Sequence, residues 1–239
     1  MPTKISPPSS LPSRNKLLTA LSQADLTSLQ PHLRLVPLPV PKDIERPHRR
    51  IESVYFLEAG VASVVAVQPG GKRAEVGLIG CEGMTGAAVV MGSGQSPHST
   101  FMQVAGAGQQ ISASELRKAM GSSASMRGLF LKFVQVLMIQ TAHTAAANAL
   151  THINQRLARW ILMVHDRAGL ETLPLTHEFL SLMLGVRRAG VTEALQELKR
   201  QKLIEMSRNK IILRDRKGMA RIALGSYGVP ESEYGRLIG

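Results

Sequence analysis

Cysteine is almost absent from this sequence. Cys81 is the only one in 239 residues, so the chain forms no internal disulfide and no multi-cysteine zinc or iron–sulfur site. Such sparing use fits a reducing cytosol, where disulfides are rare. Cys81 lies in the glycine-rich turn 80–83. We interpret it as an unreactive thiol in preference to a redox switch, because a lone thiol is reactive only where its surroundings activate it.

Acidic residues are scarce relative to basic ones. The chain has 17 Asp and Glu against 29 Lys and Arg, and its formal net charge is +12. This excess favours a polyanionic partner, either nucleic acid or an anionic membrane surface. Apolar residues make up 44% of the chain and charged residues 19%, which argues against intrinsic disorder. The length suits one or two domains with a real core.

Apolar runs suited to a signal peptide or a membrane span are missing as well. Prolines and serines interrupt residues 1–14 (MPTKISPPSSLPSR), which we expect to form a flexible arm. Residues 128–150 are long enough to cross a bilayer, but they include Lys132. A lysine near the membrane centre costs about 2.5–3.5 kcal/mol on insertion scales. We therefore expect a cytoplasmic protein without a membrane span.

The first half of the chain has the pattern of a β-rich domain. Four segments are rich in β-branched residues and read as strands: 51–57, 61–67, 73–78 and 99–104. A Pro-Gly-Gly turn within 68–71 separates the second from the third and predicts a β-hairpin. Several short strands of this kind indicate a barrel or a two-sheet roll. We expect an α+β protein whose residues 15–124 form a jelly-roll-like β-roll.

A long helix is predicted over 125–150. Its apolar side chains recur at alternating spacings of three and four residues, as in a coiled-coil seam. The partner-facing residues of this dimerisation helix are predicted to be Phe130, Phe133, Leu137, Gln140 and Thr144. A second register through Leu129 and Val136 fits nearly as well, and a core helix lying on its own domain is the alternative.

Residues 175–213 carry the most information. Thr176 can cap one helix, and Gly185 can turn the chain at its end because glycine adopts positive φ at little cost. A second helix follows, with one apolar face formed by Val191, Ala194, Leu195 and Leu198. Two short helices joined by such a turn match a helix-turn-helix. The alternating residues 203–213 then predict a hairpin, the wing of a winged helix.

The second helix also has a face suited to reading DNA bases. Opposite the apolar face lie Arg188, Ala189, Thr192, Glu193 and Gln196. Arginine pairs with guanine, glutamine with adenine and glutamate with cytosine N4, while a threonine methyl contacts thymine. Arg187 and Arg188 stand at the positive end of the helix, where a phosphate or a guanine would offset the unfavourable charge. Solvated surface arginines are the alternative interpretation.

The excess of positive charge coincides with this segment. Residues 187–221 hold 11 basic and 4 acidic residues, a net charge of +7. Cations placed along a helix-turn-helix and its wing are suited to DNA phosphates. We expect Arg208 and Lys210 of the wing to contact phosphate.

The pattern TxExLxxxLGVRRAGVTEALQEL (176–198) resembles the Crp/Fnr family of bacterial transcription regulators. Residues 155–160 (QRLARW) and 76–86 (VGLIGCEGMTG) extend the resemblance over about 15–239. It implies a signal-sensing roll, a dimerisation helix, a winged-helix domain over 151–224 and a tail over 225–239. It also implies a homodimer that places two recognition helices in successive major grooves of a near-palindromic operator. Such a protein is not an enzyme, and RNA polymerase is a candidate partner.

The resemblance assigns roles at single positions. The main base-reading places of the family fall on Arg188, Ala189 and Glu193. The cAMP-responsive members have glutamate at the second place and arginine at the third, so the operator should differ from theirs. Thr176, His177 and Arg187 fall at or near places that contact phosphate.

The sensor site departs further from the family pattern. Cyclic-nucleotide binders use a Gly-Glu pair for the ribose and an Arg-Ser pair for the phosphate. Here the corresponding residues are Gly83 and Met84, with His98 and Ser99 near the second pair. Methionine cannot accept the ribose hydroxyl bonds, and a neutral histidine replaces a bidentate arginine poorly. We predict that cAMP and cGMP do not bind productively and that no cofactor is needed; a roll that binds another small effector is the alternative.

Two further classes are less well supported. A cupin-like metalloenzyme would need clustered histidines, but His32, His48 and His98 are scattered singly. His143 and His152 lack a spaced second ligand, so we predict no metal site and no catalytic residues. Liposome binding compared with duplex binding at matched salt distinguishes a membrane-surface protein. The operator, the sign of regulation, the signal and the conformation of the tail are left open.

Overall fold

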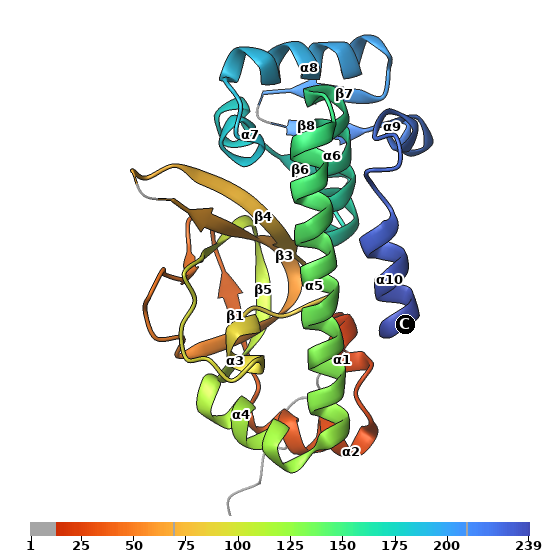
Figure 1. Ribbon diagram of the computed structural model, residues 1–239. Helices are drawn as coiled ribbons and strands as arrows, with labels where there is room; N and C mark the ends of the chain where they lie inside the picture. Colours follow the sequence, from red (N-terminus) through yellow and green to blue (C-terminus); the bar gives the residue numbers. More distant parts are fainter. Residues whose placement is uncertain (1–12, 69, 209) are drawn as a thin grey trace, which may run out of the picture.

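The N-terminal half forms a β-roll, as the sequence predicts. The computed structural model describes residues 13–239 except 69 and 209, so residues 1–12 of the expected arm lie outside the described part (Figure 1). Five antiparallel strands pair in the order β1-β5-β3-β4, with β2 also paired to β5. Their bounds are β1 Arg34–Leu38, β2 Asp43–Glu45, β3 Ser53–Val67, β4 Arg73–Ile79 and β5 Ser99–Ser112.

The two longest strands are more continuous than expected. The sequence predicts separate strands over 51–57 and 61–67, but β3 runs from Ser53 to Val67 through both, and the expected 99–104 is the start of β5. The break at Gly60 is a bend inside the strand, with φ +85°, where β3 and β5 approach closely. A Cβ on Gly106 would lie 2.0 Å from the Ala59 carbonyl oxygen. Glycine is therefore required at this crossing.

Short helices close the roll. These are α1 Lys16–Thr19, α2 Gln23–Leu29, a 3-10 turn Gln30–His32, α3 Ala87–Val90 and α4 Ala113–Ser122. The backbone before α1 is already attached to the roll, because Ser13 Oγ donates to Glu58 and the Asn15 amide donates to the Leu57 and Gly83 carbonyl oxygens. Residues 13 and 14 thus belong to the folded unit.

The long helix α5, Ala124–Leu150, begins at Ser123, whose side chain accepts from the Met126 amide. The expected partner-facing seam is wrong for this helix. Phe130 stacks at 5.5 Å on Phe56 of the roll, and Phe133 is buried. Gln140 bonds both backbone groups of Leu78, at 2.6 Å and 3.1 Å. Because this helix is apolar on most of its sides, its sequence does not indicate which side packs on its own domain. For these residues the alternative interpretation, a core helix, is the one that the structure supports.

Two further members of that seam are partly buried within the chain. Thr144 donates to the Gln140 carbonyl oxygen and accepts from Arg159, and Leu137 packs with the roll cluster. By length and composition α5 could also span a membrane. Its packing along the roll gives its apolar residues a different role.

The C-terminal half forms the predicted winged helix. Its elements are α6 Ile153–Ala168, β6 Thr172–Pro174, α7 His177–Leu184, α8 Arg188–Arg200, β7 Ile204–Ser207, β8 Lys210–Leu213 and α9 Arg216–Ile222. The three strands form one sheet in the order β6-β8-β7. Gly169 and Gly185 end α6 and α7 with φ of 61° and 62°, and for Gly185 this left-handed conformation is the one that the sequence predicts.

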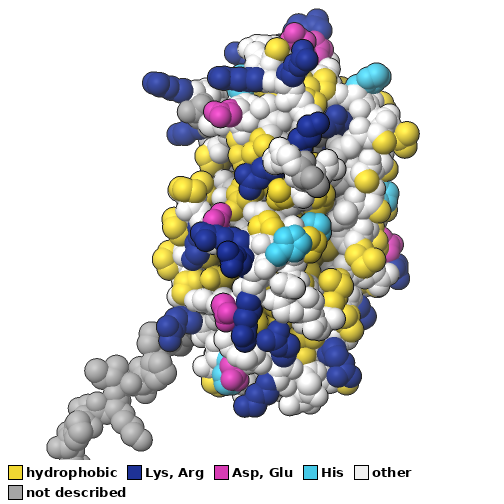
Figure 2. All heavy atoms as spheres, turned by 60° about the vertical axis from the view of Figure 1, so that its left-hand side comes forward, with side chains coloured by type: hydrophobic (Ala, Val, Ile, Leu, Met, Phe, Trp, Pro, Cys, Tyr) yellow, Lys and Arg dark blue, Asp and Glu magenta, His cyan; other side chains and the backbone are white. Residues whose placement is uncertain are grey.

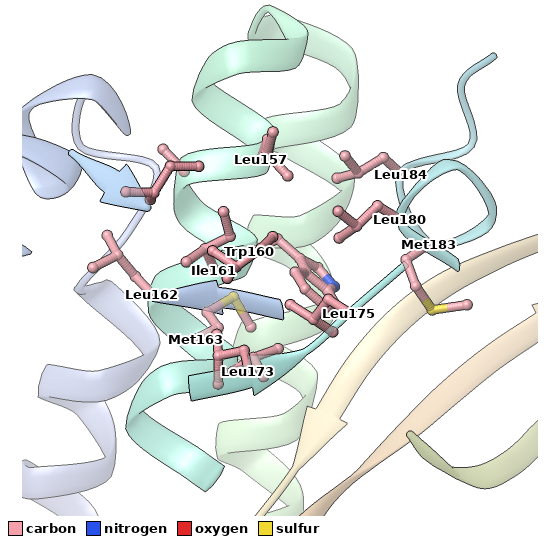
Figure 3. Packing of buried hydrophobic residues seen from close by; sticks show 14 of the residues in the cluster. Leu157, Trp160, Ile161, Leu162, Met163, Leu173, Leu175, Leu180, Met183 and Leu184 are labelled. Atoms are coloured by element: carbon pink, nitrogen blue, oxygen red, sulfur yellow. The ribbon is translucent and has the colours of Figure 1, made fainter. Parts of the chain in front are cut away.

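The winged helix and the roll share one hydrophobic core. Trp160 of α6 lies beside Leu175, Leu180 and Met183 (Figure 3). The same buried cluster includes Val61, Val65, Leu78 and Val104 from the roll. The winged helix is therefore packed directly on the roll.

The tail, whose conformation the sequence left open, folds back along α5. Its helix α10, Val229–Leu237, lies along α5 beside the roll loop that holds Cys81 and Glu82 (Figure 1). Tyr234 donates its hydroxyl to the Glu82 carbonyl oxygen at 2.8 Å. Arg167 of α6 is 7% exposed and lies 2.9 Å from Glu82 Oε1 and 3.4 Å from Glu231 Oε1. One guanidinium thus joins α6, the roll and α10.

Replacing Arg167 should destabilise the protein strongly. Arg167→Ala leaves two largely buried carboxylates, Glu82 and Glu231, without their cation, a change that typically costs about 3–5 kcal/mol. Arg216→Ala is the matched control, because that guanidinium is 46% exposed and its pair with Asp166 should contribute less than about 1 kcal/mol. Urea unfolding measures both free energies. Equal losses in the two variants would contradict this role of Arg167.

Candidate nucleic-acid interface

The helix-turn-helix is fixed by local signals. Thr176 caps α7 by accepting from the Phe179 amide at 3.1 Å, and Glu178 lies in the first turn, beside the positive helix end. Gly185 then turns the chain, and α8 begins at Arg188 with Arg187 at its N-cap. Both arginines are exposed at the start of the second helix.

The second helix buries one face and exposes the other. Its buried residues are Val191, Ala194, Leu195 and Leu198, as the sequence predicts. Four of the five expected base-reading residues are exposed on the opposite side: Arg188, Ala189, Glu193 and Gln196. The helix lies across the end of the molecule, where no other element covers it (Figure 1). This exposed face can enter a groove as a rigid unit.

Thr192 is placed differently from the other four. It is half-buried, its hydroxyl donates to the Arg188 carbonyl oxygen at 3.0 Å, and it lies 3.0 Å from His177 Nδ1. The Thr192–His177 contact joins α7 to α8. The hydroxyl therefore serves the helix pair itself.

A cleft of about 420 Å³ lies between the helix-turn-helix and the wing. It brings together residues from three separate stretches of sequence: Thr176, His177, Arg188, Arg208 and Lys210. Ser207, which the sequence analysis did not single out, also lines it. Arg187 is not among the lining residues, although it precedes Arg188 directly. The sequence predicts one interface that includes Thr176, His177, Arg187, Arg188, Arg208 and Lys210. In the fold, all of these except Arg187 line the cleft.

Three cations line this cleft, Arg188, Arg208 and Lys210, beside one acidic residue, Glu178. Within the described part of the chain, Arg187, Arg188, Arg208 and Lys210 have no carboxylate within ion-pair distance. Lys and Arg side chains project from this end of the molecule (Figure 2). Unpaired cations around a concave surface raise the local concentration of anions. The cleft is therefore suited to a phosphate backbone.

Arg200 is a further cation on α8 that the sequence analysis missed. It stands four residues after Gln196, so helical spacing alone could have indicated it. It differs from the cleft cations in being paired with Glu197. A DNA contact would have to compete with that pair.

Three of the four residues of the expected effector pocket, Gly83, Met84 and Ser99, are buried within the chain. Met84 is fully buried and pairs through its backbone with Phe56. A Cβ on Gly83 would lie 2.3 Å from the Phe133 ring, so α5 packs directly on this loop. His98 is half-buried, and Ser99 is buried at the start of β5. Burial and the Glu82 charge raise the pKa of the Cys81 thiol nearby.

Comparisons with known proteins agree with this architecture. Residues 155–222 match the Crp-like helix-turn-helix domain family. No curated protein matches the chain in sequence.

Solved structures extend the likeness over most of the chain. A transcriptional regulator assigned to the Crp/Fnr family, from Eubacterium rectale, has a TM-score of 0.67 at 17% identity, covering 87% of this chain and 97% of its own. TTHB099, a CRP-family regulator from Thermus thermophilus, has 0.63 at 18%, covering 80% and 96%. The c-di-GMP responsive regulator CLP from Xanthomonas campestris has 0.63 at 15%, covering 81% and 100%. The expected resemblance is confirmed by the domain match and by the fold.

Proposed function

We propose that this chain, a Crp/Fnr-type transcription regulator by its helix-turn-helix domain and its fold, binds a near-palindromic DNA operator as a homodimer. The observation that carries the proposal is the exposed face of α8 beside a cleft lined by three unpaired cations. DNA binding of this kind requires no catalytic step. The protein acts in the cytoplasm, where RNA polymerase is a candidate partner.

The residues around α8 divide into two roles. Arg188, Ala189, Glu193 and Gln196 are exposed where base edges would lie, and Thr192 presents its side chain at the margin of that face. Thr176, His177, Arg208 and Lys210 line the cleft that would follow the backbone, with Arg187 beside them. Phosphate contacts position the protein, and base contacts select the sequence.

Selection of bound duplexes from genomic DNA, followed by salt titration, tests this assignment. Arg188→Ala should weaken binding to the selected duplex by about 1–3 kcal/mol and relax the preference at one base pair. Lys210→Ala should weaken all duplexes alike and lower the salt slope by about 1. Arg236→Ala is the control, because this arginine lies on α10 and pairs with Glu233. An unchanged motif and affinity in Arg188→Ala would refute the assignment.

The homodimer would form through the outward face of α5. Its seam alternates by three and four residues through Gly128, Leu131, Gln135, Met138, Ala142, Ala145 and Ala149. Leu131 and Met138 are exposed, and the alanines leave room for a second helix to approach. This face points away from the residues that pack on the roll. A second copy of the chain would bury it.

A charge in this seam should break the dimer. Met138→Glu places a carboxylate at a position that is 65% exposed in the single chain, so folding is preserved while association is lost. Leu35→Glu is the control, because Leu35 is 62% exposed on β1 and outside the seam. Sedimentation velocity should give a dimer for the wild type and the control and a monomer for Met138→Glu. A Met138→Glu dimer would rule out this face.

The burial of Met84 supports the absence of a cAMP response. Met84 and Phe56 are fully buried, Phe133 of α5 packs on Gly83, and Met84 provides no acceptor for ribose. Isothermal titration of the protein with cAMP should therefore give no saturable heat at micromolar concentrations. Saturable micromolar binding would overturn this part of the proposal and favour an effector-dependent regulator.

A further inference from the structure

One carboxyl group of the roll reaches into the core of the winged helix. Glu75 of β4 is 6% exposed. Its Oε1 accepts from the Trp160 indole at 2.7 Å, and its Oε2 lies 2.6 Å from Ser63 Oγ of β3. Trp160 belongs to α6 and is the only tryptophan in the chain. This polar contact therefore joins the two halves of the protein inside their shared core.

The contacts around Glu75 leave its buried carboxyl group without a counter-charge. Ser63 Oγ lies within hydrogen-bond distance of both Glu75 Oε2 and Gln103 Oε1. Within the described part of the chain, no cation lies within ion-pair distance of Glu75. A buried carboxylate without a paired cation is costly, so burial favours the neutral acid, whose O–H can donate to Ser63.

The charged groups around Glu75 belong mainly to α6. Arg159 donates to the Ser226 carbonyl oxygen and to Thr144, and Arg156 donates to the Leu184 carbonyl oxygen, so both are held by other partners. Arg167 is held by Glu82 and Glu231. The other neighbours are uncharged: Gln140, Thr144, Ala147 and Asn148 of α5, and Met183 and Leu184 of α7.

Burial raises the pKa of Glu75 from its ordinary 4.5 to about 7, and the hydrogen bonds from Ser63 and Trp160 offset this only in part. The positive charges of Arg159 and Arg167 also act to lower the pKa of Glu75, but they do not cancel the effect of burial.

We propose that Glu75 is a positioning residue, which as the neutral acid holds the winged helix on the roll through Trp160 and weakens that hold when it ionises. An effect of this contact on DNA affinity rests on the proposed function. The contact between Glu75 and Trp160 does not depend on that function.

The sign of the pH effect follows from linkage. A separated winged helix would leave Glu75 in water with its ordinary pKa, so the packed state binds the proton more tightly. The packing is strongest relative to the separated state below about pH 4.5 and weakens as the pH rises through about 7. Acidification within that range tightens the contact.

Tryptophan fluorescence of the full-length protein tests the contact without DNA. Between pH 5.5 and 8.5 the emission of Trp160 should shift to the red with a midpoint near 7, and quenching by acrylamide should increase. Glu75→Gln should remove this transition and keep the blue emission throughout, because its amide oxygen can accept from Trp160 and its NH2 can donate to Ser63. Circular dichroism checks that the variant is folded.

Two outcomes would overturn the proposal. One is a wild-type emission that does not change over this range. The other is an identical transition in folded Glu75→Gln, which would assign the titration to another group. Glu233→Gln, a change at an exposed carboxylate of α10, should titrate like the wild type.

A separate measurement tests the regulatory meaning. The affinity for the selected duplex should differ between pH 6 and pH 8 in the wild type and not in Glu75→Gln. If the fluorescence transition is observed but the affinity for the duplex does not depend on pH, the proposed Glu75 contact is supported and its effect on DNA binding is refuted. Failure to select any duplex would instead refute the proposed function, while the fluorescence result would still decide the Glu75 contact.

Discussion

The position of the DNA-binding half depends on polar side chains buried where α5 and α6 meet the roll. Gln140 bonds the Leu78 backbone, Glu75 accepts from Trp160, and Arg167 lies between two carboxylates. Buried polar groups are costly unless they are paired, and two of these contacts, Glu75 with Trp160 and Arg167 with Glu82, join α6 to the roll. The orientation of α8 therefore depends on buried contacts that α8 itself does not make.

Local features of the winged helix could be predicted from sequence because their causes are local. The Thr176 cap, the Gly185 turn and the apolar face of α8 each follow from residues a few positions apart, and the structure contains all three. The hairpin between β3 and β4 follows from its turn in the same way. The cleft required more, because its lining comes from α7, α8 and the wing.

Features that depend on distant contacts could not be predicted in this way. Periodicity showed that α5 has apolar faces, but only the packing of Phe130 and Phe133 on the roll shows which face is left for a partner. The docking of α10 depends on Glu82, which lies 152 residues before Tyr234 in the sequence. Glu75 reads in the sequence as an ordinary polar residue of a hairpin strand. Its burial follows from the position of Trp160 in another domain.

These contacts also bear on how a signal could reach DNA. Phe133 and Met84 fill the loop region of the roll against α5, so an effector that entered there would have to displace core side chains, which is costly in a close-packed interior. Glu75 and Arg167, by contrast, join the two halves through ionisable side chains. A change in charge at this junction alters the packing of α6 directly, and α8 packs on α6. The junction is therefore closer to α8 in the chain of packed elements than the interior of the roll is.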